Sequence, residues 1–417
     1  MKTKDHFFKA VCTLAIPVAL QSMLQSSFSM VDQIMIGQLG EINVAGVGLA
    51  GKFASIYSVV ISAIGAVAGI MIAQYLGQKN RSEVRRSFFT NLLLGAGIAG
   101  MFMVICTLFP NQIMGAYTRD VQTRQAAAEY LMLISGTFVP MAGATLLSTL
   151  FRCLEKPRLP LYASILSALL NTGLNYIMIF GKLGISPMGV RGAAFATVIS
   201  QCANFLLMLL MLSKNGFLLK SNEGEPTATL RMNWGQYWSM LLPLLVCEVV
   251  WSLGENVYAA IYGHMSTDAS AAMTLTNPIQ GLVIGALCGL SQAASVIIGK
   301  HLGSGENEEA YWSAKKLMLY GAIGSALLSV IVMIASKAYV GIYQVDNAVK
   351  TMTMQILFAY AIVVPFKVLN MILGGGIIRS GGRTKYVMFI DMVGTWCFGI
   401  SLIVFHRRKW MKQLKAS

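Results

Sequence analysis

Long apolar runs, separated by short polar connections, dominate the chain. A helix needs about 20 mostly apolar residues to cross a hydrocarbon core roughly 30 Å thick. Runs of about that length or more predict eleven spanning helices, at residues 11–36, 44–75, 87–109, 126–151, 159–180, 190–212, 234–262, 269–298, 312–334, 352–378 and 386–405. The runs are continuous, whereas strands of a membrane barrel alternate apolar and polar residues over about ten positions. We therefore expect an all-α integral membrane protein.

The composition favours lipid as the surrounding solvent. Of 417 residues, 56% are hydrophobic and 12% are charged, and the mean hydropathy is +0.64. Soluble domains carry about 25% charged residues. The seven cysteines and four histidines are scattered, which favours neither a disulfide framework nor a metal site. The net charge of +15 comes without a basic stripe interleaved with aromatic residues, so we expect no nucleic-acid partner.

Lysine and arginine are distributed unevenly between alternate connections. If the N-terminus is cytoplasmic, the regions on that side carry nineteen of these residues and the opposite connections carry six. Cytoplasmic loops carry such an excess, so we expect a cytoplasmic N-terminus. After eleven spans the tail would lie outside, yet five basic residues lie between Arg407 and Lys415. Either one span is missing or the last run does not cross.

The two halves of the chain repeat each other at a nearly constant offset. Gly37 pairs with Gly263 and Gly77 with Gly303, and Arg152 pairs with Arg379 at an offset one position longer. The repeat predicts two parallel six-span units, at residues 1–212 and 234–417, joined by a cytoplasmic polar linker at 213–233. The sixth span, at 190–212, has no room to recur in full, so the second bundle is expected to be incomplete at its end.

Four short motifs occur in the order typical of one transporter family. They are VDQIMIGQLG at 31–40, Gly77 with its repeat partner Gly303, GVRGAAFAT at 189–197 and RSGGRTK at 379–385. Together with the duplicated unit, they make the chain from about residue 14 to 399 resemble the multidrug and toxic compound extrusion (MATE) transporters.

The resemblance implies two six-helix bundles around a V-shaped cavity. It implies antiport of organic cations against Na⁺ or H⁺ by alternating access, by a monomer in the bacterial inner membrane, with no cofactor. The expected partners are small organic cations and the lipid bilayer. Family members usually have twelve spans, whereas here residues 395–399 resemble the middle of span eleven and 400–415 the end of span twelve. An internal deletion that fuses the two would explain both the basic tail and the missing span.

Charged residues within the runs are candidate functional residues, because a charge at the bilayer centre costs from about 2.5 kcal/mol upwards. Asp32 is the one charged residue of the run at 11–36. It is either an interfacial acid that caps a neighbour, or a carboxylate for which a proton or cation competes with substrate. The resemblance implies the second role, and places Asn171, Asn175 and Thr197 beside it. Asn175 stands where some relatives carry a second acid.

The seventh and tenth runs carry further candidates. Glu248 and Glu255 are seven residues apart and so share one face of a helix, with Asn256 beside the second. The tenth run carries Lys367 and Asn370, where sodium-coupled family members place an acid. Glu255 and Lys367 therefore form either an ion pair or part of an ion site. A transient Na⁺ would bind at Asp32 or Glu255.

Several alternatives stay open. A flippase for lipid-linked sugars, of the same superfamily, would need a more basic cavity than these mostly acidic residues provide. An enzyme would need a catalytic constellation, and the sequence has no His-rich cluster and no phosphate loop, which also argues against an ATP-driven pump. A product inactivated by the shortened second bundle is a further alternative. Asp391, in the last run, is expected to be structural.

Overall fold

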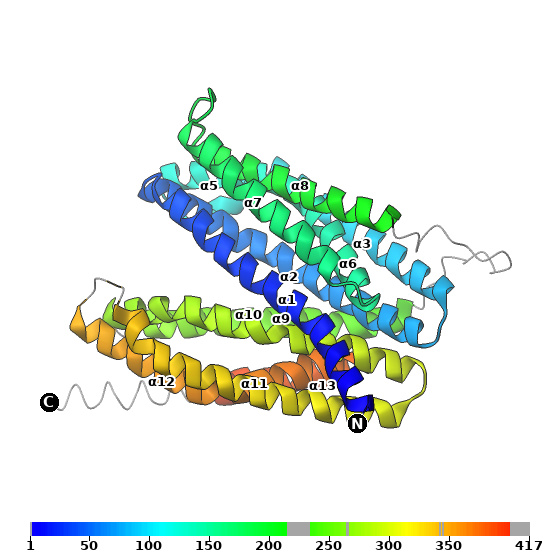
Figure 1. Cartoon of the computed structure of the whole chain (residues 1–417). Helices are drawn as coiled ribbons and strands as arrows, with labels where there is room; N and C mark the ends of the chain where they lie inside the picture. Colours follow the sequence, from blue (N-terminus) through cyan, green and yellow to red (C-terminus); the bar gives the residue numbers. More distant parts are fainter. Residues whose placement is uncertain (1, 215–233, 264–266, 342, 344–345, 401–417) are drawn as a thin grey trace. The chain divides into compact units, whose positions relative to one another are not determined.

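The computed structural model describes residues 2–214, 234–263, 267–341, 343 and 346–400, and these residues form helices and no strand. The chain divides into two compact units, residues 1–233 with 303–305, and residues 234–302 with 306–417. Figure 1 shows the helices coloured along the chain.

The first unit contains eight α-helices and one 3₁₀ turn within the described residues. They are α1 (Lys2–Gly37), α2 (Glu41–Gly77), α3 (Arg81–Leu108), α4 (Pro110–Gly115), α5 (Val121–Ile134), η1 (Ser135–Thr137), α6 (Phe138–Cys153), α7 (Arg158–Phe180) and α8 (Val190–Lys214). Helix α2 packs against α3, α5 and α6, whereas α7 packs against α1 and α8.

The second unit contains five α-helices and two π-helical segments in its described part. They are α9 (Trp234–Gly263), α10 (Thr267–Gly303), α11 (Asn307–Gly341), α12 (Asn347–Asn370), η2 (Met371–Ile378), α13 (Thr384–Met392) and η3 (Val393–Ile400). Helix α11 packs against α12, and α13 packs against α9.

Ten helical stretches in the described residues are long and apolar enough to cross a membrane. They coincide with the first ten predicted runs, which confirms the all-α membrane architecture. The eleventh run, 386–405, is described as far as residue 400, where it forms α13 and η3. Residues 401–417, which include the basic tail, and the linker 215–233 lie outside the described residues.

The ends of the helices follow from local chemistry. Asn80 and Asp120 precede α3 and α5, and their side chains accept hydrogen bonds from the backbone N–H groups of Glu83 and Thr123, which satisfies donors left free at a helix start. Helix α7 ends at Gly181, whose φ of 69° lies in the left-handed region that glycine adopts readily.

Aromatic packing stabilises the centre of the first unit. The ring of Tyr57 on α2 is fully buried and stacks on that of Phe138, with centroids 4.2 Å apart. Its hydroxyl donates to the Phe138 carbonyl at 2.5 Å, which satisfies the one polar atom of the buried side chain. Large apolar side chains elsewhere point outward, including Leu93, Leu108 and Leu206, as expected where the surrounding solvent is lipid.

The repeat seen in the sequence recurs in the helix boundaries. Four helix starts (Glu41, Arg81, Val121 and Arg158) have counterparts at the offset of the glycine pairs, namely Thr267, Asn307, Asn347 and Thr384. The ends of α1 and α2 recur at the same offset, in α9 and α10. The two units are therefore duplicates, helix by helix, through the fifth span of each.

Candidate substrate and ion site

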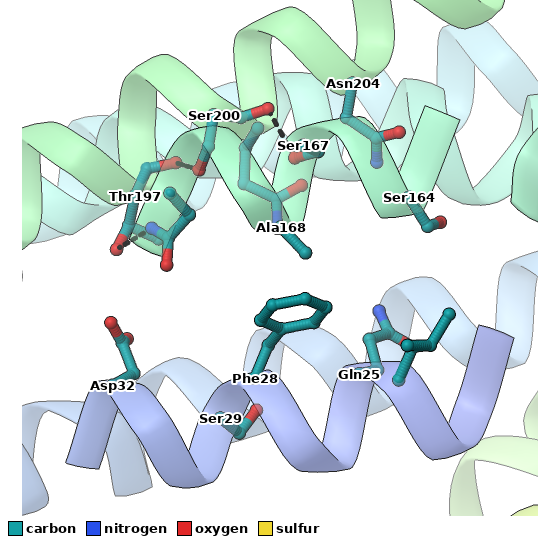
Figure 2. A pocket seen from close by; sticks show the side chains of 13 residues that line it. Gln25, Phe28, Ser29, Asp32, Ser164, Ser167, Ala168, Thr197, Ser200 and Asn204 are labelled. Atoms are coloured by element: carbon teal, nitrogen blue, oxygen red, sulfur yellow. Dashed lines mark hydrogen bonds between the residues drawn. The ribbon is translucent and has the colours of Figure 1, made fainter. Parts of the chain in front are cut away.

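Asp32 lies near the end of α1 and faces polar side chains of α7 and α8 (Figure 2). The Asn175 side-chain amide donates to the Asp32 carboxylate and, at 3.2 Å, to Asn171 Oδ1. Asn171 Nδ2 in turn lies 3.4 Å from Thr197 Oγ1. The structure thus brings together, from three helices, all four residues of the first predicted cluster.

The residues of this cluster differ in how deeply they are buried. Asn175 is fully buried, whereas Asp32 is half-buried and lines a cavity of about 170 Å³. Asp32 is the one charged residue among the described residues that line this cavity. Carboxylate, amide and hydroxyl oxygens are ligands that hard cations prefer, so the cluster is suited to a proton, a small metal cation or an organic cation.

Further residues of this cavity were not predicted. Gln25, Phe28 and Ser29 line it from α1, and the α7 and α8 hydroxyls contribute as well. An electrostatic interaction also links the buried Tyr130 of α5 with Asp32. The signal that would have found the α1 residues is the spacing of Gln21, Gln25 and Asp32, which lie on one face of a helix at intervals of four and seven.

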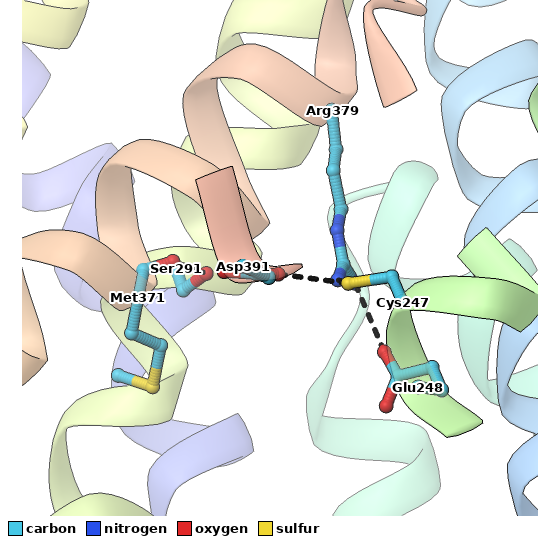
Figure 3. Close-up of polar contacts among 6 residues, drawn as sticks. All are labelled: Cys247, Glu248, Ser291, Met371, Arg379 and Asp391. Carbon is cyan, nitrogen blue, oxygen red and sulfur yellow. Dashed lines mark hydrogen bonds and ion pairs between the residues drawn. The ribbon is translucent and has the colours of Figure 1, made fainter. Parts of the chain in front are cut away.

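The second unit has a larger cavity, of about 500 Å³, and Arg379 is among the residues that line it. Figure 3 shows the polar contacts around Arg379. Arg379 Nη1 lies 3.3 Å from Glu248 Oε1, and Nη2 lies 3.5 Å from the Cys247 sulfur. The Cys247 thiol donates to Asp391 Oδ2 at 2.7 Å. Arg379, directly after η2, therefore contacts two residues of α9. One of these, Cys247, also contacts Asp391 of α13.

The predicted residues of the second half separate into two groups. Glu248, Lys367 and Asn370 line this cavity. Glu255 is exposed on α9 and is not among the lining residues, and the Asn256 side chain lies outside the described residues. Seven residues raise Glu255 about 10 Å above Glu248 along the helix, so the two acids share a face but not a level.

The ion pair of this cavity is Glu248 with Arg379. Among the described residues, Glu255 and Lys367 form no ion pair. The sequence contains two acids on α9, Glu248 and Glu255, and two bases towards the end of the fourth span of this unit, Lys367 and Arg379. Side-chain positions determine which acid pairs with which base.

Equivalent contacts occur in the two units. In the first unit, Arg152 Nη2 lies 3.4 Å from Gln21 Oε1, and Gln21 Nε2 donates to Ser164 Oγ at 2.8 Å. Gln21 corresponds to Cys247 at the offset of the helix starts, and Arg152 and Ser164 correspond to Arg379 and Asp391 at an offset one position longer. Each unit thus has an arginine at the end of its fourth span. This arginine contacts a polar residue of the first span, and that residue forms a hydrogen bond with the fifth span. Gln21 and Ser164 of the first unit are neutral, whereas Glu248 and Asp391 of the second unit are acids.

Comparison with known proteins agrees with this duplicated architecture. The MatE family model matches the chain twice, at residues 17–177 and again at 243–405. The chain belongs to the MatE family. The starts of the two matched segments of this MatE protein are separated by the same offset as the helix starts. A model of the lipid II flippase MurJ also matches, over the shorter range 119–270.

Curated relatives of this MatE protein are bacterial transporters. A probable multidrug resistance protein NorM of Thermotoga maritima is 24% identical over 93% of this chain and 83% of its own length. The uncharacterized transporter YisQ of Bacillus subtilis is 22% identical over 96% of this chain and 88% of its own length.

Solved structures share the fold. A crystal structure of MATE in complex with MaL6 has a TM-score of 0.84 and 16% identity, covering 94% of this chain and 87% of that one. A MOP superfamily transporter from Pyrococcus furiosus, described as having a binding pocket of reverse polarity, has a TM-score of 0.82 at 16% identity, covering 96% of this chain and 88% of that one. The chain is thus a multi-pass membrane protein of a multidrug efflux family.

Proposed function

We propose that this MatE protein exports small organic cations in exchange for Na⁺ or H⁺, and that Asp32 is the carboxylate for which ion and substrate compete. The observation that carries the proposal is the position of Asp32. It is the one charged residue lining the cavity of about 170 Å³ in the described part of the first unit, and a buried amide donates to it. A carboxylate held in this way attracts cations and repels anions.

Competition for one carboxylate is sufficient to couple two fluxes. An ion that neutralises Asp32 removes the charge that binds an organic cation, and a bound cation excludes the ion. If each occupant favours a different arrangement of the helices, the free energy of ion entry drives export. Asn175 and Asn171 supply oxygen atoms beside the carboxylate, which makes a sodium ion as well as a proton compatible with the site.

The second cavity is proposed to assist substrate binding. Its charged lining residues are Glu248, Asp391, Arg379 and Lys367, so acidic and basic groups are equal in number. A cation entering it would compete with Arg379 for Glu248, and this exchange would be weaker than binding at an unpaired acid.

A flippase for a lipid-linked sugar is the second candidate, and the match to the MurJ model favours it. Such a substrate carries phosphate, and its site would need a basic surface. The Asp32 cavity has the opposite charge, which is why cation export is the primary proposal.

Efflux of the cationic dye ethidium tests the proposal. Cells that produce the wild-type chain should extrude ethidium faster than control cells, with a rate that responds to a sodium or proton gradient. Asp32→Asn should reduce this rate to the background, because the amide keeps the shape of the side chain and removes its charge.

Glu248→Gln should reduce ethidium efflux only in part, because this variant still has Asp32. Glu255→Gln is the matched control on the same helix. Asp120→Asn controls for loss of an acid outside the spans. Unchanged efflux in both Asp32→Asn and Glu248→Gln would contradict the site, and accumulation of a lipid-linked sugar on deletion of the gene would favour the flippase.

A further inference from the structure

A second cavity of about 200 Å³ adjoins the Asp32 cavity inside the first unit. Four residues line both, namely Gln25, Ser164, Gln201 and Asn204. The two cavities joined by these shared residues are called the polar tract below. It lies between α1, α6, α7 and α8, with Asp32 at one end and Arg152 at the other.

The polar tract follows from the spacing of polar residues on its helices. On α6, Thr145, Ser148, Thr149 and Arg152 occur at helical intervals and line the tract. On α8, Thr197, Ser200, Gln201 and Asn204 do the same. Residues three, four and seven apart share one face of a helix. Polar faces in a membrane helix turn towards one another because lipid cannot satisfy them.

Some buried side-chain atoms that face the tract lack a hydrogen-bond partner among the described residues. Two examples are Ser148 Oγ on α6 and Asn204 Oδ1 on α8. A buried polar atom without a partner costs about 1–3 kcal/mol. A water molecule occupies about 30 Å³ of liquid, and a roomy polar cavity is where buried water is stable. Volumes of about 200 and 170 Å³ therefore have room for several water molecules.

The length of the tract makes its ends important. Gln21, which contacts Arg152, precedes Asp32 by eleven residues on α1, and at 1.5 Å per residue these positions are about 16 Å apart. That is roughly half of a hydrocarbon core about 30 Å thick. A hydrated path of this length would let cations move between Asp32 and the Arg152 end of the tract unless something opposed them.

Arg152 is in a position to oppose them. Asp32 and Arg152 are the two charged residues among the described residues that line the tract. A fixed positive charge in a narrow polar passage repels protons and metal cations while water remains. The equivalent arginine of the second unit, Arg379, lies beside the acid Glu248.

We propose that the polar tract is filled with water, and that the guanidinium of Arg152 prevents cations from crossing it to and from Asp32. This barrier deepens the proposed function, because an exchanger whose ion can cross without substrate is uncoupled. Both tests below are made without drug, so they can fail or succeed independently of cation export.

Hydroxyl-radical footprinting of the wild-type protein tests for water, because radicals formed from bound water label neighbouring methionines. Met208 lines the tract and is 1% exposed, and Met114 is equally buried at 0% but does not line it. Met208 should be labelled several-fold faster than Met114. Equal labelling of the two would overturn the hydrated tract.

Proton entry into proteoliposomes tests the barrier. Purified full-length protein is reconstituted with an internal pH-sensitive dye, the membrane potential is held at zero with potassium and valinomycin, and the outside is acidified. A unit charge roughly 10 Å from the path, at an effective dielectric constant of about 20, raises the barrier for a passing cation. Removing that charge should increase the rate at which the cation crosses by about tenfold or more. Arg152→Gln should therefore accelerate proton entry by at least about that factor.

Two further variants decide what such a leak means. Arg152→Lys keeps the charge and should stay as tight as wild type. Arg86→Gln removes another largely buried arginine of the same unit, one that pairs with Glu83 on its own helix and does not line the tract, and it should also stay tight. Wild-type tightness of Arg152→Gln, or an equal leak in Arg86→Gln, would overturn the barrier.

Discussion

Asn175 is the residue on which the Asp32 site depends most directly. Its side chain is fully buried and donates both to Asp32 and to Asn171. The sequence placed these residues together by resemblance, but it did not indicate that the amide would face the acid. It equally failed to distinguish Glu248 from Glu255, because side chains on one helix face differ in level.

Replacing Asn175 should weaken function without abolishing the fold. A hydrogen bond to a charged group contributes about 1.5–3 kcal/mol, and about 1.36 kcal/mol corresponds to a factor of ten. Asn175→Ala should therefore lower ethidium affinity or efflux by about tenfold or more. Asn91→Ala is the matched control, since Asn91 is equally buried but donates to a carbonyl of its own helix. Equal losses in the two variants would assign the effect to stability.

At the scale of single helices, the two units wind their fourth long helix differently. The first unit has a 3₁₀ turn at η1 before α6, and the second has the π-helical η2 after α12. A π-helical segment accommodates an extra residue. This fits the longer offset between Arg152 and Arg379, because the extra residue is absorbed before the second arginine is reached. Hydrophobic periodicity could not predict either departure from the α-helix.

Glycine is required at one place in η2. A Cβ on Gly376 would lie 2.7 Å from the Ser291 carbonyl oxygen and 2.8 Å from Ala294 Cβ, whereas on Gly374 its nearest neighbour would be at 3.7 Å. Overpacking costs about 1–3 kcal/mol. Gly376→Ala should lower the melting temperature in detergent by several degrees, and Gly374→Ala should leave it unchanged or raise it. The reverse order would contradict the packing of η2 on α10.

The start of α5 should be sensitive to pH. Hydrogen bonds from the side chain and backbone N–H of Thr123 hold the pKa of Asp120 below its usual value. The stabilisation is therefore complete above the unfolded-state pKa of about 3.9 and disappears as the pH falls through the lower folded-state pKa. Melting curves should show Asp120→Ala below wild type at pH 7, with the gap closing in acid. A gap that widened in acid would refute this role.

At the scale of the whole molecule, apolar runs and the repeat predicted the membrane architecture well, because lipid imposes long helices on any chain that crosses it. Ten of the eleven predicted runs appear as spanning helices. The eleventh run, 386–405, is described only as far as residue 400. The lining of the cavities was harder to predict, since neutral residues such as Gln25 and Ser164 carry no signal by themselves.

The charge distribution predicts that the N-terminus is cytoplasmic, and labelling tests this orientation. Leu183, between α7 and α8, is 85% exposed, and Glu155, between α6 and α7, is also exposed. In a variant without the exposed Cys397, a membrane-impermeant maleimide should label Leu183→Cys in intact cells and Glu155→Cys only after lysis. Labelling of Glu155→Cys but not of Leu183→Cys in intact cells would contradict a cytoplasmic N-terminus.

The constant offset between the two units has an evolutionary consequence. The connections between the first three spans have the same length in both units, although most side chains around them have diverged. Loops normally gain and lose residues freely. Equal lengths in two diverged copies indicate that these connections tolerate inserted or deleted residues less well than ordinary loops.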